Sequence, residues 1–219
     1  MFNVVRPAEA PPSLAARKKY DDEDVYKAIC TIFHSKCYLC ETKEPHDINV
    51  EHFRAHLNDD NLKYDWNNLY FACSRCNNIK GKIYNDLLDC CNPHQNVLRA
   101  IKHLPPNTPY AKTVQIVPNI DSAPALSTTE LLDKIYNSEH TVNKKVSGSY
   151  LRKKIFDQYN LLLTQISDYY KPLATQEEKI TAIERIKILI REDQPYSAFM
   201  NWCILEDEEL SELLKEFII

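Results

Sequence analysis

Glycine is scarce in this sequence: only Gly81 and Gly148 occur among 219 residues. Dinucleotide-binding fingerprints and P-loops each need several glycines in a short segment, because the backbone must turn tightly and approach the phosphates closely. The sequence therefore excludes a nucleotide-binding loop of either kind.

Long apolar runs are also missing. The first twenty residues contain Arg17, Lys18 and Lys19 and several prolines, without the apolar stretch of a signal peptide. No later run reaches the length of a membrane span. We expect a cytoplasmic protein that does not associate with membranes, in which cysteines are thiols or metal ligands and not disulfides.

The sequence lacks an excess of positive charge. It has 27 basic and 31 acidic residues, and a net charge of −4. A protein that binds a duplex mainly through its phosphates is expected to be basic. If this protein acts on nucleic acid, a local patch or a partner must supply most of the affinity.

Short β-type runs and a helical run follow one another in the first half. The runs lie at 48–50 and 68–72, and a helical pattern begins near Cys76. A helix is predicted before them, from Asp22 to about His34. The region from 37 to 89 therefore has the order strand, loop, strand, helix.

The second half has mainly helical periodicity. Ser127 with Glu130, and Thr175 with Glu178, have the spacing of capping boxes. Apolar stripes predict a small antiparallel bundle, in which one helix ends before Pro172. The predicted fold class is α+β, mostly α. Its segments are an extended N-terminal arm (1–21), a core (22–92), an irregular connection (93–128) and a helical region that packs on the core or a partner (129–219).

Four cysteines form two C-x-x-C pairs, Cys37 with Cys40 and Cys73 with Cys76. Each pair can present two thiolates to one tetrahedral ion, so together they are typical of a structural Zn²⁺ site. A redox dithiol is the alternative for one pair, but it does not explain two pairs that bracket a β-type segment. A closed four-thiolate site has no open coordination position, so any chemistry must lie elsewhere.

The first cysteine pair is followed by VEHFRAH and then by WNNLYFACSRCNNIKG, which contains the second pair. In this order they resemble the HNH motif of the ββα-metal endonucleases, in its zinc-bearing form. The resemblance covers residues 37–81 and implies a zinc-bound ββα-metal core. It implies that His52 is the general base, Asn68 the middle Asn, and Glu51 and Asn77 the ligands of a catalytic Mg²⁺ or Mn²⁺.

Physical chemistry agrees with these roles. A His near neutral pKa suits the activation of water, and a hard cation suits oxygen ligands and phosphate. Adjacent strand residues point to opposite faces, so Glu51 and His52 share a site only if the strand twists or bulges there. Nucleic-acid contacts are expected from nearby basic residues, namely Arg54, Arg75, Lys80, Lys82 and His56. The alternative is a zinc-stabilised unit whose polar residues only satisfy hydrogen bonds.

A wider and weaker resemblance includes RPAEAPPSL, FHSKCYLCE and LLDCCNPH. With the helical tail, these segments resemble the HNH nuclease subunit (PtuB) of Septu-type anti-phage systems, which has relatives among retron effectors. That resemblance implies a DNA substrate in preference to RNA and an ABC-type ATPase partner (PtuA-like). In a retron it also implies a reverse transcriptase with its RNA–DNA. An RNA nuclease of the same fold and an inactive zinc-binding adaptor remain alternatives.

Overall fold

The computed structural model describes residues 1–139 and 146–218. It is mostly helical, with 47% helix and 9% strand in two small sheets, which confirms the predicted α+β fold class. No helix among the described residues is long and apolar enough to cross a membrane. The elements of the first half are η1 (Pro12–Ala16), α1 (Glu23–Ile32), β1 (Ile48–His52), α2 (Asp60–Lys63), η2 (Trp66–Asn68), β2 (Leu69–Cys73) and α3 (Ser74–Lys80). Those of the second are α4 (Val97–Ala100), β3 (Ile101–Leu104), β4 (Gln115–Pro118), α5 (Ala123–Asn137), α6 (Gly148–Tyr170), α7 (Gln176–Leu189), α8 (Ser197–Leu205) and α9 (Glu208–Leu213).

The expected strand, loop, strand, helix order is present as β1, β2 and α3. β1 pairs with β2 in an antiparallel register that places Ile48 opposite Cys73 and His52 opposite Leu69. Every residue of β2 is buried, and α1 packs on this strand with Val25 and Ile29 in the core. The hairpin is thus fixed on both sides, which gives the following helix a rigid base.

α3 begins directly after β2 and ends at Gly81. Gly81 has φ +53° and ψ −145°, a positive-φ conformation that glycine adopts without the steric cost of a Cβ. Its backbone N–H donates to the carbonyl of Asn77 at 2.9 Å. One of the two glycines is therefore used to stop the helix that carries Asn77.

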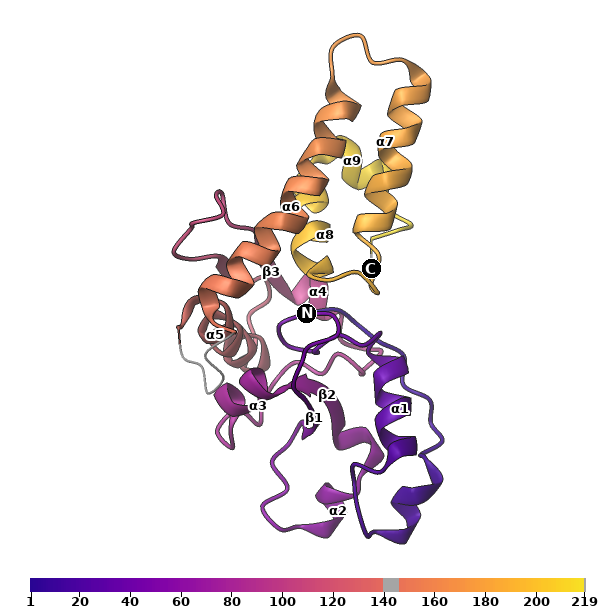
Figure 1. Ribbon diagram of the computed structural model, residues 1–219, viewed down its shortest axis with the longest axis vertical. Coiled ribbons are helices and arrows are strands. Elements are labelled where there is room, and N and C mark those ends of the chain that lie inside the picture. Colours follow the sequence, from indigo (N-terminus) through magenta and orange to yellow (C-terminus); the bar gives the residue numbers. More distant parts are fainter. Residues whose placement is uncertain (140–145, 219) are drawn as a thin grey trace.

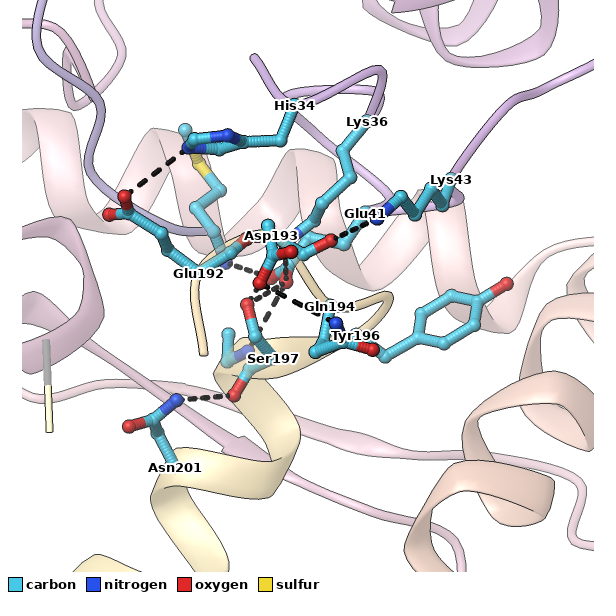
Figure 2. A network of polar contacts seen from close by, with 12 residues as sticks. His34, Lys36, Glu41, Lys43, Glu192, Asp193, Gln194, Tyr196, Ser197 and Asn201 are labelled. Atoms are coloured by element: carbon cyan, nitrogen blue, oxygen red, sulfur yellow. Dashed lines mark hydrogen bonds and ion pairs between the residues drawn. The ribbon is translucent and has the colours of Figure 1, made fainter. Parts of the chain in front are cut away.

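A buried polar network joins the first cysteine loop to the C-terminal half (Figure 2). Lys36 Nζ lies 3.3 Å from Glu41 Oε2, and Ser197 Oγ donates to the same oxygen at 3.0 Å. Burial alone would raise the pKa of Glu41, but the Met1 amino group and Lys36 hold it well below its usual range. The loop that carries Cys37 and Cys40 is therefore anchored to the first residue of α8.

The predicted irregular connection is more ordered than expected. Residues 93–128 contain α4, the antiparallel pair β3–β4 and the start of α5. α5 begins at Ala123, where Ser122 Oγ accepts from Ala125 N, so the predicted capping box of Ser127 and Glu130 is wrong. The box of Thr175 and Glu178 is confirmed at the start of α7.

Two long helices dominate the rest of the molecule. α6 and α7 form an antiparallel hairpin that projects away from the end of the molecule that holds β1, β2 and α1 (Figure 1). α8 is almost wholly buried and contacts β3, α6 and α9. The helical half is therefore joined to the ββα unit through the first turn of α8 and through α5, which contacts α3.

Candidate functional site

The four cysteines of the two C-x-x-C pairs converge, as the sequence predicts. All four are buried, and their sulfur atoms lie within 4.8 Å of one another. Cys40 Sγ and Cys73 Sγ are 3.8 Å apart. Four sulfurs at about 2.3 Å from a tetrahedral Zn²⁺ are separated by about 3.8 Å, so the cluster fits this ion.

The electrostatics of the cluster favour a bound cation. Burial raises the pKa of the Cys37 and Cys76 thiols well above the usual value, whereas hydrogen bonds from the neighbouring thiols lower that of Cys40. Four buried thiols cannot all ionise without a compensating positive charge, and zinc binds the thiolate form. The residues thus fit a structural zinc that fixes β2 and α3 to the first cysteine loop.

Glu51 is buried and faces α3. Its Oε1 lies 2.7 Å from Lys80 Nζ, and the same ammonium donates to the carbonyl of His52 at 3.0 Å. Lys80 has 0% and Glu51 3% of its side chain exposed, so this is an internal ion pair. It fixes β1 to the end of α3.

The second carboxylate oxygen of Glu51 has no partner. Oε2 is buried and makes no hydrogen bond within the described part of the chain. Burial raises the pKa of Glu51 to about 7, against the opposing effect of Lys80. A free, buried carboxylate oxygen is the type of ligand that a divalent cation takes, so Glu51 can serve Lys80 through Oε1 and a cation through Oε2.

His52 lies on the other side of β1, at its last residue. Its Nε2 is 3.0 Å from the carbonyl oxygen of Lys63 at the end of α2. Because a carbonyl only accepts, Nε2 must carry a proton, and Nδ1 of the neutral ring is left with a free lone pair. Burial lowers the pKa of His52, which favours this neutral form at neutral pH.

Two rings cover His52. Tyr20 meets it edge-on with ring centroids 4.6 Å apart, and His56 lies at the same centroid distance from its own loop. Tyr20 follows directly on the exposed basic residues Arg17, Lys18 and Lys19 of the N-terminal arm. The end of the arm therefore lies at the predicted catalytic base.

Asn68 is used internally. Its Oδ1 accepts from the backbone N–H of Arg54 at 2.7 Å, and its Nδ2 donates to the carbonyls of Arg54 and Leu62, each at 2.9 Å. The side chain is 4% exposed. It therefore positions the loop that follows His52, and does not face a substrate.

Asn77 lies on α3, three residues before Lys80 and so on the same side of the helix. Its side chain is half-buried and makes no hydrogen bond to any other described residue. β1 and α3 pack against each other, which places Asn77 on the helix that Glu51 faces. Its amide oxygen is available to a ligand.

The sequence left open whether a twist or bulge brings Glu51 and His52 to one site, and β1 pairs with β2 without a bulge. The register is continuous from Ile48 to His52. Glu51 therefore faces Lys80, and His52 faces Lys63 and Tyr20, as alternation on a strand requires. One substrate can contact both side chains only if it lies at the end of β1, where both faces of the strand can be reached.

The predicted nucleic-acid contacts divide into two groups. Arg54 and Lys82 are exposed and His56 is half-exposed. Arg75 and Lys80, however, are buried, which differs from the expected surface cluster. Arg75 donates to the carbonyl of Ile135 on α5 and to that of Ser138, the C-cap of this helix, and Lys80 is paired with Glu51. Both cations stabilise the interior and are not free to meet phosphate.

The structure adds residues that the sequence argument did not find. Tyr20 and the Lys63 carbonyl contact His52, and Asn85 Oδ1 accepts from Ala55 N at 2.8 Å. Only Asn85 had a signal, as a polar residue just after the motif. Contacts by a distant ring or a backbone carbonyl have no residue pattern.

One comparison with known families matches the segment that holds these residues. Residues 37–82 match the HNH endonuclease family, a segment that contains β1, β2, α3 and all four clustered cysteines. A search of curated proteins finds no match. The chain thus contains an HNH endonuclease domain, which indicates a metal-dependent nuclease.

Proposed function

We propose that this protein is a metal-dependent HNH endonuclease that hydrolyses phosphodiester bonds of DNA. The observation that carries the proposal is the orientation of His52. Within the segment that matches the family, its Nε2 is bound to the Lys63 carbonyl and its Nδ1 is left free as a base. The carbonyl partner fixes the tautomer, so the basic lone pair lies on the nitrogen that is left free.

In this proposal His52 Nδ1 takes a proton from the attacking water, since the neutral ring predominates at neutral pH. Glu51 Oε2 and the Asn77 amide oxygen would hold a Mg²⁺ or Mn²⁺ ion. Bound there, the ion would supply positive charge for the departing oxygen. Asn68 holds the loop beyond His52, and the four-cysteine zinc site holds the hairpin against α3.

Substrate contacts are assigned to exposed or half-exposed basic groups of the matched segment and of the arm. Arg54, His56 and Lys82 lie in or next to the matched segment, and Arg17, Lys18 and Lys19 precede Tyr20 on the arm. Exposed cations bind phosphate through charge and hydrogen bonds. Such a local group would offset the net charge of −4 of the whole chain.

We further propose that the protein is the nuclease effector of a bacterial anti-phage complex of the Septu or retron type, with an ABC-type ATPase partner. The resemblance of the arm and of LLDCCNPH supports this, as does the lack of a nucleotide-binding loop in the sequence. The rings over His52 and the Lys80 pair on Glu51 suit a site that is restrained until assembly.

The test is cleavage of plasmid DNA and of tRNA by the zinc-loaded protein with Mg²⁺ or Mn²⁺, alone and with the ATPase encoded beside it. His52→Ala is compared with His94→Ala, which removes an exposed imidazole outside the matched segment. DNA cleavage that only His52→Ala abolishes supports the proposal. Cleavage of tRNA alone would assign the site to RNA, and no cleavage by any combination would favour an adaptor.

A further inference from the structure

A second group of metal-ligating and nucleophilic side chains lies outside the candidate site. In the part of the chain that the structure describes, a carboxylate oxygen of Asp89 and the sulfurs of Cys90 and Cys91 lie within 4.8 Å of one another. The two cysteines are adjacent in the sequence and are not in a disulfide. They form a vicinal dithiol between α3 and α4.

The two thiols have different surroundings. Cys90 is 1% exposed, and burial raises its pKa well above the usual value. Cys91 is half-buried and lines a cavity of about 360 Å³ with residues of the arm, including Val4 and Arg6. One thiol can thus be reached from solvent, and its neighbour is kept protonated.

A fixed guanidinium lies beside Cys91. Arg6 donates to Cys91 Sγ at 3.4 Å, and also to the carbonyls of Trp66 at 2.9 Å and Leu69 at 2.7 Å. Its position is held further by the rings of Trp66 and Tyr70, at 4.7 Å and 4.9 Å from the guanidinium carbon. The hydrogen bond with Cys90, followed by the charge of Arg6, lowers the pKa of Cys91 to about 7.

The nearest negative group is already engaged. Asp89 Oδ1 accepts hydrogen bonds from the Tyr70 hydroxyl and from the backbone N–H of Cys91. These donors offset the carboxylate charge beside the sulfur. The surroundings of Cys91 thus favour a thiolate, which is the nucleophilic form of cysteine.

We propose that Cys91 is an oxidative modification site that reacts with hydroperoxides, with Cys90 as the resolving thiol. The Cys91 thiolate attacks one peroxide oxygen, the O–O bond breaks, and a sulfenic acid forms while the other oxygen leaves after protonation, as water from hydrogen peroxide or as an alcohol from an organic hydroperoxide. The Cys90 thiol then attacks the sulfenic sulfur, the S–O bond breaks, and a water molecule leaves. Two electrons from the thiol pair reduce one peroxide, and the product is a Cys90–Cys91 disulfide.

The adjacency of the two residues makes this product easy to reverse. Consecutive Cα atoms are about 3.8 Å apart across a trans peptide, which is shorter than the separation in ordinary disulfides. The resulting strain makes the bond more reducible. The modified sulfur would lie beside Arg6, whose carbonyl partners Trp66 and Leu69 flank Asn68.

The expected rate advantage follows from the thiolate fraction. At pH 7 a thiol of pKa about 7 is half ionised, whereas an ordinary thiol is roughly 3% ionised. The lower intrinsic nucleophilicity of an acidic thiol removes part of this gain. A net advantage of about three- to fivefold over an ordinary thiol remains.

The test uses limiting hydrogen peroxide on the zinc-loaded full chain, followed by denaturing alkylation and peptide mass spectrometry. Tryptic peptide 83–99 contains Cys90 and Cys91 and no other cysteine. In the native sequence we expect it to lose two hydrogens at least about threefold faster than Cys30 is oxidised. With Cys90→Ser, oxidation should stop at a sulfenic acid on Cys91 that dimedone traps, and with Cys91→Ser peptide 83–99 should stay reduced.

Arg6→Met should slow the reaction by about two- to threefold, whereas Arg17→Met, an exposed cation on the same arm, should not. The proposal is overturned if Cys91 reacts no faster than Cys30 within the native protein. It is also overturned if Cys91→Ser leaves Cys90 equally oxidised. The first comparison needs no variant, so a substitution that fails to fold does not weaken the test.

Discussion

Replacing Lys80 by methionine distinguishes a structural role of this side chain in an internal ion pair from a role in phosphate binding. The sequence favours contact with phosphate, whereas the structure places Lys80 at 0% exposure with its Nζ 2.7 Å from Glu51 Oε1. Removing one partner of a buried ion pair leaves an uncompensated charge and costs about 3–5 kcal/mol. We expect Lys80→Met to lose this amount of unfolding free energy.

The matched control is Lys82→Met, two residues further along and exposed. An exposed substitution of this kind changes stability by about 0.5 kcal/mol or less. Urea unfolding of the zinc-loaded proteins gives both values. Combining Lys80→Met with Glu51→Gln should cost less than the sum of the two single changes, because the double variant buries no charge.

A change in DNA binding without a change in stability would refute the assignment of Lys80 to an internal ion pair. If Lys80 met phosphate, Lys80→Met would leave stability unchanged, weaken DNA binding, and lower the slope of log affinity against log salt by about one. We expect that effect, without a loss of stability, from Lys82→Met.

Three further predictions concern zinc, pH and the ring over His52. Removing zinc with a chelator should lower the melting temperature by about 10 °C or more, because β2 and α3 are then no longer bound to the first cysteine loop. Calorimetry at matched ionic strength measures the melting temperature. Cleavage should rise with pH through about 7, because a cation needs the ionised form of Glu51 and the pKa of Glu51 is raised to about 7. The pKa of His52 is lowered, so this base is already neutral over that interval. A fall in the cleavage rate over the same interval would contradict both assignments. Tyr20→Ala should speed carbethoxylation of His52 by roughly two- to tenfold, since one ring contact contributes about 0.5–1.5 kcal/mol. An unchanged rate would show that Tyr20 does not cover the base.

The sequence predicted the ββα unit well because short segments of the chain contain the signals for its strands, helix and cysteine pairs. Short β-type runs indicated β1 and β2, and two C-x-x-C pairs indicated one metal cluster. Thr175 and Glu178 cap α7 because both groups of a capping box lie within one turn.

The errors arise where contacts between distant segments decide the outcome. Ser127 has capping chemistry, but Ser122 with Pro124 in the first turn starts α5 earlier. A short strand was expected near β4, but its partner β3 was not, because strand pairing depends on a distant segment. α8 is almost wholly buried, so its sequence shows no clear amphipathic period. Arg75 and Lys80 were expected at the surface because a sequence gives charge but not burial.

The resemblance to the HNH motif named Glu51, His52, Asn68 and Asn77 as site residues, but the sequence did not predict their geometry. The spacing did not reveal that Asn68 binds only backbone groups or that Lys80 occupies one oxygen of Glu51. Those facts depend on α2 and α3 packing around β1.

The most direct test of the central claim is the rate at which zinc-loaded His52→Ala nicks supercoiled plasmid in Mg²⁺, with and without added imidazole. Loss of a general base typically costs a factor of about 10²–10⁴. We predict a loss of this size and partial recovery with imidazole, which can occupy the vacated space and accept the proton. Undiminished cleavage by His52→Ala, at matched zinc content, would contradict the assignment of His52 as the base.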